Sequence, residues 1–164
     1  MNYFSKIGFK VVLLAVIGIT VMLSCNSNQK YPDEPQIEFV SYSFRDTLDI
    51  LGNPNVHLGL LTISFTDGDG DIGLYQSETE LTDVFIYRIG ILNGSPSLSD
   101  MDTLNFRIPY LTPEAQNKTL RGEIDVEFNL YKANYPYDTM YYELYIQDRA
   151  LNTSNIITTP EIVL

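Results

Sequence analysis

Three aspartates alternate with glycines in the segment 66–73 (TDGDGDIG). Carboxylates at alternate positions, Asp67, Asp69 and Asp71, can converge on one ion, and the glycines between them let the backbone curl around it. Calcium takes about six to eight oxygen ligands and fits this composition, although magnesium or manganese would use the same oxygens. The alternative is that all three are solvated turn residues, because Asp and Gly are also common turn formers.

The spacing of these aspartates resembles the calcium loop of EF-hand proteins. The three carboxylates match its first three ligand positions, and the resemblance implies a water-bridged position at Tyr75 and a final acidic ligand at Glu78. Ile72 stands where that family has glycine, and a strand rather than a helix leads into the loop. We therefore expect a calcium loop with similar first ligands but not a true EF-hand.

Asp148 is expected as a further carboxylate at the same place. The segment 148–154 (DRALNTS) resembles the Asp-x-Ala-Gly-Asn-x-Ser turn of bacterial immunoglobulin-like domains, with Leu151 in place of the glycine. In such a sandwich the loop between the second and third strands and the loop between the sixth and seventh lie at one end. The expected metal ligands are therefore Asp67, Asp69, Asp71, Glu78 and Asp148.

Alternation of apolar and polar residues predicts strands throughout the rest of the chain. The clearest case is 123–130 (EIDVEFNL), whose period of two is typical of a half-buried strand. Seven strands are expected, at 36–45, 56–66, 83–92, 103–111, 120–131, 139–148 and 155–163, separated by turn-forming residues. This pattern predicts an all-β fold, an antiparallel immunoglobulin-like sandwich over residues 36–164.

Residues 1–24 have the pattern of an export signal. Two lysines precede the apolar run 11–23, which is shorter than the roughly 20 residues that cross a bilayer. The residues Met-Leu-Ser-Cys at 22–25 resemble the lipobox of bacterial lipoproteins, which implies cleavage before Cys25 and acylation of that cysteine. The polar residues up to Pro35 are expected to form a flexible tether. A plain secretory signal or a single membrane helix is the alternative.

The charge balance narrows the classes of partner. The chain has 10 basic and 21 acidic residues and a net charge of −11. Affinity for nucleic acid comes largely from neutralising phosphates, so nucleic acid is not expected as a partner, whereas a cation is. The lipobox resemblance implies membrane attachment through the lipid and a place in the cell envelope, as an outer-membrane lipoprotein facing the periplasm or the cell surface.

Catalysis is not expected from this composition. His57 is the only histidine, and it shares the strand face of Leu61 and Ile63, which favours a partly buried structural role. The usual nucleophile–base arrangements therefore cannot be assembled. Tyrosines cluster at 131–145, which favours packing within the strands; the alternative is that Tyr135 and Tyr137 lie on an exposed face and stack on a glycan.

Three Asp-Thr-aliphatic triplets occur in the chain. They resemble the O-glycosylation signal of exported proteins in the Bacteroidota, which makes Thr47, Thr103 and Thr139 candidate acceptors. Each triplet also lies where a strand is expected to begin, a place that Asp-Thr suits for structural reasons.

Two longer segments, 61–74 (LTISFTDGDGDIGL) and 145–164 (YIQDRALNTSNIITTPEIVL), look like a family of uncharacterised lipoproteins from the Bacteroidota. The resemblance covers most of residues 36–164 and implies an envelope location and a sandwich fold, but no activity. We therefore expect a lipid-anchored, non-enzymatic binding or assembly module of the cell envelope, stabilised by calcium. A glycan-binding accessory lipoprotein with a Tyr-rich surface is the alternative.

Overall fold

The structure, a computed structural model, describes residues 31–48, 52, 54, 56–111, 118–131 and 136–163, with the backbone alone at 98–102. Within these ranges the elements are β1 (Gln36–Thr47), β2 (Val56–Asp67), β3 (Val84–Leu92), β4 (Ser95–Phe106), β5 (Leu120–Tyr131), β6 (Thr139–Ile146), β7 (Ile157–Thr158) and β8 (Ile162–Val163). The compact unit begins at Tyr31, before the expected start at residue 36. The predicted signal peptide and Cys25 lie outside the described residues.

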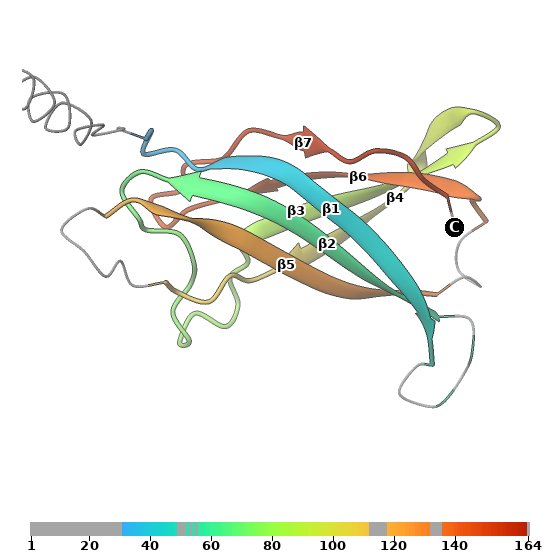
Figure 1. Cartoon of the computed structure of the whole chain (residues 1–164), viewed down its shortest axis with the longest axis horizontal. Helices are drawn as coiled ribbons and strands as arrows, with labels where there is room; N and C mark the ends of the chain where they lie inside the picture. Colours follow the sequence, from blue (N-terminus) through green and yellow to red (C-terminus); the bar gives the residue numbers. More distant parts are fainter. Residues whose placement is uncertain are drawn as a thin grey trace, which may run out of the picture. The chain divides into compact units, whose positions relative to one another are not determined.

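The strands form two antiparallel sheets packed face to face. One sheet has the order β1-β2-β5, and the other has the order β4-β3-β6-β7, with β8 also paired to β6. Figure 1 shows the first sheet lying over the strands of the second. The predicted all-β, immunoglobulin-like sandwich is confirmed. None of the described ranges contains a helix that could cross a lipid bilayer.

The core lies between the two sheets and is built from alternate residues of each strand. Leu61 and Ile63 of β2 and Leu144 and Ile146 of β6 are fully buried members of one apolar cluster. Phe128 of β5 packs edge-on against Tyr142 of β6, with ring centroids 5.3 Å apart, so aromatic rings from both sheets meet in the middle. Such edge-to-face pairs add to the hydrophobic effect of burial.

Two strands differ from the sequence-based expectation. The fourth begins at Ser95 rather than at 103, because Asn93 and Gly94 both have positive φ (53° and 75°) and form a two-residue hairpin of the type I′ class. The expected strand at 155–163 is present only as β7 and β8, on either side of Pro160. Proline has no N–H to donate to the ladder, which explains the interruption.

Candidate metal centre

The four aspartates Asp67, Asp69, Asp71 and Asp148, which we call the acidic cluster, meet at one end of the sandwich. Asp67 is the last residue of β2, and Asp148 follows the end of β6. Each contributes a carboxylate oxygen, and these oxygens all lie within 4.8 Å of one another. Asp67 is 0% exposed and Asp148 4% exposed, while the other two are half-buried. The structure thus brings together two loops that the sequence separates by more than seventy residues.

The loop after β2 curls because its glycines and one apolar residue cooperate. Gly70 and Gly73 have positive φ, 69° and 90°, a conformation that favours glycine. Between them Ile72 is fully buried in the core, and its backbone N–H donates to Oδ2 of Asp67 at 3.0 Å. The isoleucine that stands where an EF-hand has glycine is therefore an apolar anchor, and the tight turns fall on its neighbours.

Asp148 is held by the turn that follows it. The backbone N–H of Asn152 donates to its Oδ1 at 2.7 Å, and the side-chain amide of Asn152 donates to its Oδ2 at 2.8 Å. Leu151 has a φ of 69°, in the left-handed region that glycine prefers. This is the position at which the resembling turn has glycine, so the leucine keeps the turn conformation at a cost in backbone strain.

Three oxygens of the acidic cluster lack a hydrogen-bond donor. Oδ1 of Asp67, of Asp69 and of Asp71 are each buried, and no group among the described residues donates to them. A buried polar atom without a partner costs about 1–3 kcal/mol, more when it is charged. Burial, and after it the charges of Asp69 and Asp71, raises the pKa of Asp67 from 3.8 to about 7, although the hydrogen bond from Ile72 opposes the shift.

The same causes act on Asp71, whose pKa is raised first by burial and then by the charges of Asp148 and Asp69. A cluster of this kind is stable at neutral pH if the carboxylates share a proton or if a cation neutralises them. Carboxylate oxygens from glycine-containing loops are the ligands that hard divalent cations such as calcium prefer. The described residues therefore fit a cation site, with Asp67, Asp69, Asp71 and Asp148 as its ligands.

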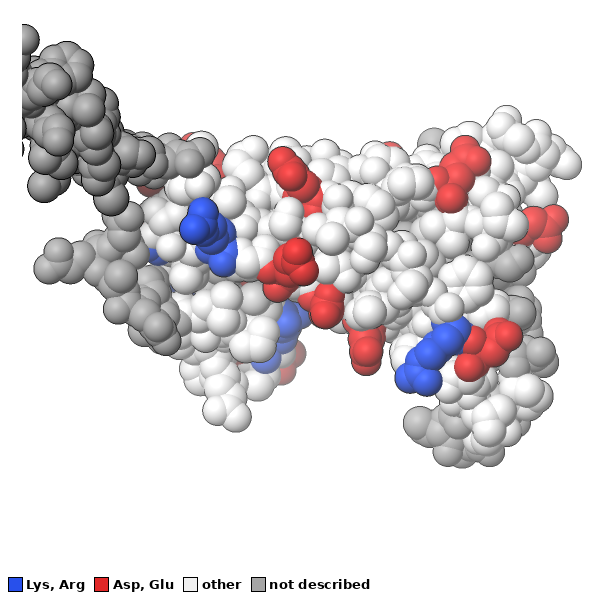
Figure 2. Space-filling model, viewed as in Figure 1, with Lys and Arg blue, Asp and Glu red and all other residues white. Residues whose placement is uncertain are grey.

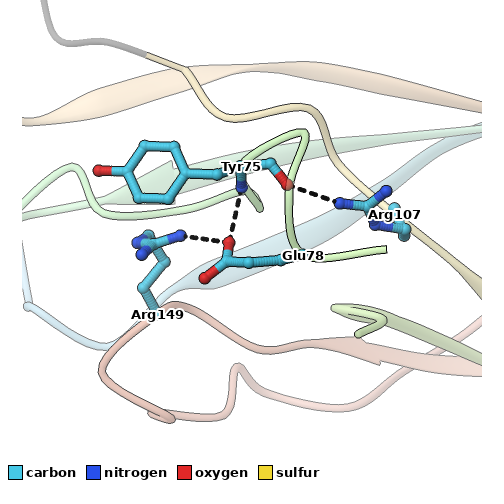
Figure 3. A network of polar contacts seen from close by, with 4 residues as sticks. All are labelled: Tyr75, Glu78, Arg107 and Arg149. Atoms are coloured by element: carbon cyan, nitrogen blue, oxygen red, sulfur yellow. Dashed lines mark hydrogen bonds and ion pairs between the residues drawn. The ribbon is translucent and has the colours of Figure 1, made fainter. Parts of the chain in front are cut away.

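Glu78 lies outside the acidic cluster, contrary to its expected role as the last acidic ligand. Figure 3 shows its carboxylate between two donors: Oε2 accepts the backbone N–H of Tyr75 at 2.7 Å and Nη1 of Arg149 at 2.8 Å. The hydrogen bond from Arg149, and then that from Tyr75, lowers the pKa of Glu78. The expected ligand is instead part of an ion pair.

Arg149 is the residue of this site that sequence reasoning missed. Its guanidinium carbon lies 3.9 Å from the ring centroid of Tyr75, and Arg107 donates to the carbonyl oxygen of Tyr75 at 2.9 Å (Figure 3). Tyr75 also packs against Tyr110, with centroids 4.3 Å apart. This network fixes the later part of the loop beside Asp148. Only its position next to Asp148 could have suggested Arg149.

The tyrosines proposed for glycan binding are not supported as an exposed platform. Tyr137 is 6% exposed, its ring fills the space that a Cβ at Gly90 would need, and its hydroxyl donates to Ser97 at 3.1 Å. Tyr137 is therefore a packing residue, as the favoured interpretation of the tyrosine cluster expects, and not a platform for a glycan. Tyr135 lies outside the described residues.

The remaining predicted residues have varied surroundings. Thr139 begins β6, as expected, but Thr47 ends β1 and Thr103 is an exposed residue inside β4. His57 is 2% exposed, with Nδ1 2.9 Å from a carboxylate oxygen of Asp46, so it is buried more deeply than the partly buried structural role predicted from the sequence.

No protein-family model, no curated protein and no solved structure matches this chain. The resemblance to lipoproteins of the Bacteroidota therefore stays a prediction from the sequence, and the function is argued from the geometry of the site.

Proposed function

We propose that the protein is a lipid-anchored, non-enzymatic binding or assembly module of the cell envelope, whose two acidic loops are tied together by a divalent cation, with calcium as the preferred ion. The observation that carries the cation site is the set of three buried Oδ1 atoms, of Asp67, Asp69 and Asp71, that no described group hydrogen-bonds. Asp148 lies within reach of the same ion from a second loop.

Calcium is favoured over magnesium by the flexibility and number of the ligands. Calcium accepts irregular shells of about six to eight oxygens, whereas magnesium demands near-octahedral geometry and gives up water reluctantly. Four carboxylates from two loops offer several oxygens without imposing an octahedron. Asp69 and Asp71 are half-buried, so solvent can complete the shell on their side.

Anchoring and location are proposed from the sequence. The basic start, the apolar run 11–23 and Cys25 at its end support acylation of that cysteine. Two acyl chains suffice for stable attachment to a bilayer, whereas one is marginal. The proposed position is the outer membrane, facing the periplasm or the cell surface.

The surface supports a cationic rather than a phosphate-bearing partner. The outward residues of β5 include the exposed Glu123, Asp125 and Glu127. Figure 2 shows more acidic than basic side chains on the face that it displays. Catalysis is not proposed, because the one histidine is buried against Phe44 and Asp46.

Thermal unfolding of the full-length chain in detergent tests the cation site. Calcium raises the free energy of unfolding by RT ln(1 + [L]/Kd), about 2.7 kcal/mol at a hundredfold excess over Kd. We expect calcium to raise the melting temperature, chelator to reverse the rise, and Asp69→Ala to abolish the response. The matched control is Asp138→Ala, at an exposed aspartate that directly precedes the first residue of β6, whereas Asp148 follows the last. This variant should keep the response to calcium. A melting temperature that is equal in calcium and in chelator would refute the cation site and favour the alternative, in which the aspartates are turn residues.

A further inference from the structure

Residues 31–37, the first described residues of the chain, are held by both loops of the acidic cluster. The backbone N–H of Gly68, between Asp67 and Asp69, donates to the carbonyl oxygen of Pro32 at 2.9 Å. The approach is so close that a Cβ at Gly68 would collide with the carbonyl oxygen of Pro32. The loop after β2 therefore fits directly against the backbone of the entering chain.

The loop after β6 holds the same segment further along the chain, at Ile37. The backbone N–H of Ile37 donates to Oδ1 of Asn155 at 2.8 Å, and Nδ2 of Asn155 donates to the carbonyl oxygen of Ile37 at 2.9 Å. A single amide side chain thus satisfies both backbone groups of Ile37, as a neighbouring strand would. This bond joins the start of β1 in one sheet to the chain that leads into β7 in the other.

Each contact is a short chain distance from a carboxylate of the acidic cluster. Gly68 is flanked by two of its members, and Asn155 follows the turn in which Asn152 holds Asp148. Ser154, beside Asn155, is fixed to the end of β6: its N–H donates to the carbonyl of Ile146 at 2.9 Å, and its Oγ accepts the N–H of Ile146 at 3.0 Å. The positions of the two loops therefore decide whether both contacts to residues 31–37 can exist together.

We propose that the cation-bound acidic cluster is a clasp for residues 31–37, closed when a divalent cation joins the two loops and opened when the unneutralised carboxylates push them apart. This inference rests on the cation binding proposed above. It adds a consequence that cation binding alone does not require: the ion controls where the folded domain begins.

The clasp would set how far the domain stands from its anchor. With Cys25 as the lipid-bearing residue, the chain from Cys25 to Tyr31 spans at most about 20 Å, and that from Cys25 to Gln36 at most about 40 Å. Closing the clasp would therefore about halve the longest stretch of chain that can separate Cys25 from the folded domain.

Hydrogen exchange of the full-length chain in detergent tests the clasp, because the donors of its two contacts are backbone amides. We expect the exchange rates of the Gly68 and Ile37 amides to be lower by a factor of about ten or more in calcium than in chelator, because calcium suppresses local opening. Calorimetric titration of the same sample with calcium reports binding separately. Binding without a change at Gly68 and Ile37 would overturn the clasp and leave the proposed cation site intact. Absence of binding would overturn both.

A pair of glycine variants tests the coupling from the other direction. Because coupling is reciprocal, damage to the clasp must weaken cation binding. Gly68→Ala removes no carboxylate but displaces Pro32, so its Kd for calcium should rise about fivefold or more. In Gly122→Ala the added Cβ would meet Phe65 at 3.4 Å, an ordinary contact, and the Kd should not change. Equal Kd values for the two variants would contradict the clasp. If Gly68→Ala does not fold, the hydrogen exchange of Gly68 and Ile37 in the wild type still tests the proposal.

Discussion

Replacement of Asp67 by asparagine should have opposite effects with and without calcium. Asparagine keeps an oxygen that can accept the N–H of Ile72, now bonded to Oδ2 at 3.0 Å, but it carries no charge. The folded-state pKa of Asp67 is about 7 without a cation, above its ordinary 3.8, so the folded chain binds more protons than the unfolded chain between these values. The stability that this proton provides is full below about pH 4 and is lost as the pH rises through 7.

The size of the effect follows from the shift. A rise from 3.8 to about 7 corresponds, at about 1.4 kcal/mol per pH unit, to about 4 kcal/mol lost above pH 7. The half-buried Asp69 and Asp71 can turn towards solvent and relieve part of this repulsion, so we expect Asp67→Asn to recover about 1–3 kcal/mol in chelator. At roughly 4 °C per kcal/mol for a domain of this size, the melting temperature should rise by about 4–12 °C.

In saturating calcium the order should reverse, because the variant has lost a charged ligand while the wild type gains the binding free energy of the ion. The assay is thermal or urea unfolding of both proteins at pH 7.5 in calcium and in chelator. Asp138→Asn, an exposed aspartate, is the control and should differ little from the wild type in either condition. If Asp67→Asn is destabilised equally in both conditions, Asp67 acts as a hydrogen-bonded turn residue and the reasoning is refuted.

Three further predictions concern single residues. Leu151→Gly should stabilise the protein by about 0.5–1 kcal/mol, because Leu151 is 72% exposed and has a φ of 69°. The control is Ile156→Gly, at a residue that is also exposed but has no positive φ, and it should destabilise the protein. If both variants are less stable than the wild type, backbone strain at Leu151 is not the cause. Burial raises the pKa of Asp83 to about 6, so the stability that its proton provides is lost as the pH rises from 4 through 6. The free energy of unfolding of Asp83→Asn, relative to that of the wild type, should therefore increase by up to about 3 kcal/mol between pH 4 and pH 7. A difference between the two proteins that does not change with pH would contradict this. Cys25→Ala should abolish both the acyl mass and membrane fractionation, and a variant that stays membrane-bound would favour a membrane helix at residues 11–23.

The acidic cluster was predictable because two independent patterns agree. The alternation of Asp67, Asp69 and Asp71 is visible locally, and the order of the strands places the loop of Asp148 at the same end of the sandwich. Neither pattern depends on the exact course of the backbone. Spacing and topology therefore indicate the cluster, although the burial of Asp67 and its unpartnered oxygen can be read only from the structure.

Glu78 was misplaced because its assignment assumed the backbone of another loop. In an EF-hand a helix carries the last ligand back to the ion, whereas here Ile72 enters the core and Gly73 turns the chain towards Tyr110. The residues after this turn pack on Arg149 instead of returning to the acidic cluster. Chain spacing alone does not contain this change of direction.

The packing partner of Tyr137 and the start of β4 could not be predicted from the sequence for a similar reason. The space that receives the ring of Tyr137 exists because residue 90 on another strand is glycine, and this is a tertiary contact with no local signature. In β4 the residues 95–102 are mostly small or polar, so no alternation marks a strand; pairing with β3 across a type I′ turn determines their structure.

The most direct test of a cation that joins two loops is a crystal structure of the protein grown with calcium and measured for anomalous scattering. The geometry predicts one calcium peak about 2.3–2.6 Å from oxygens of Asp67, Asp69 and Asp71 in the first loop and of Asp148 in the second. Carboxylates that share protons or bind only water in saturating calcium, with no anomalous peak between them, would contradict it.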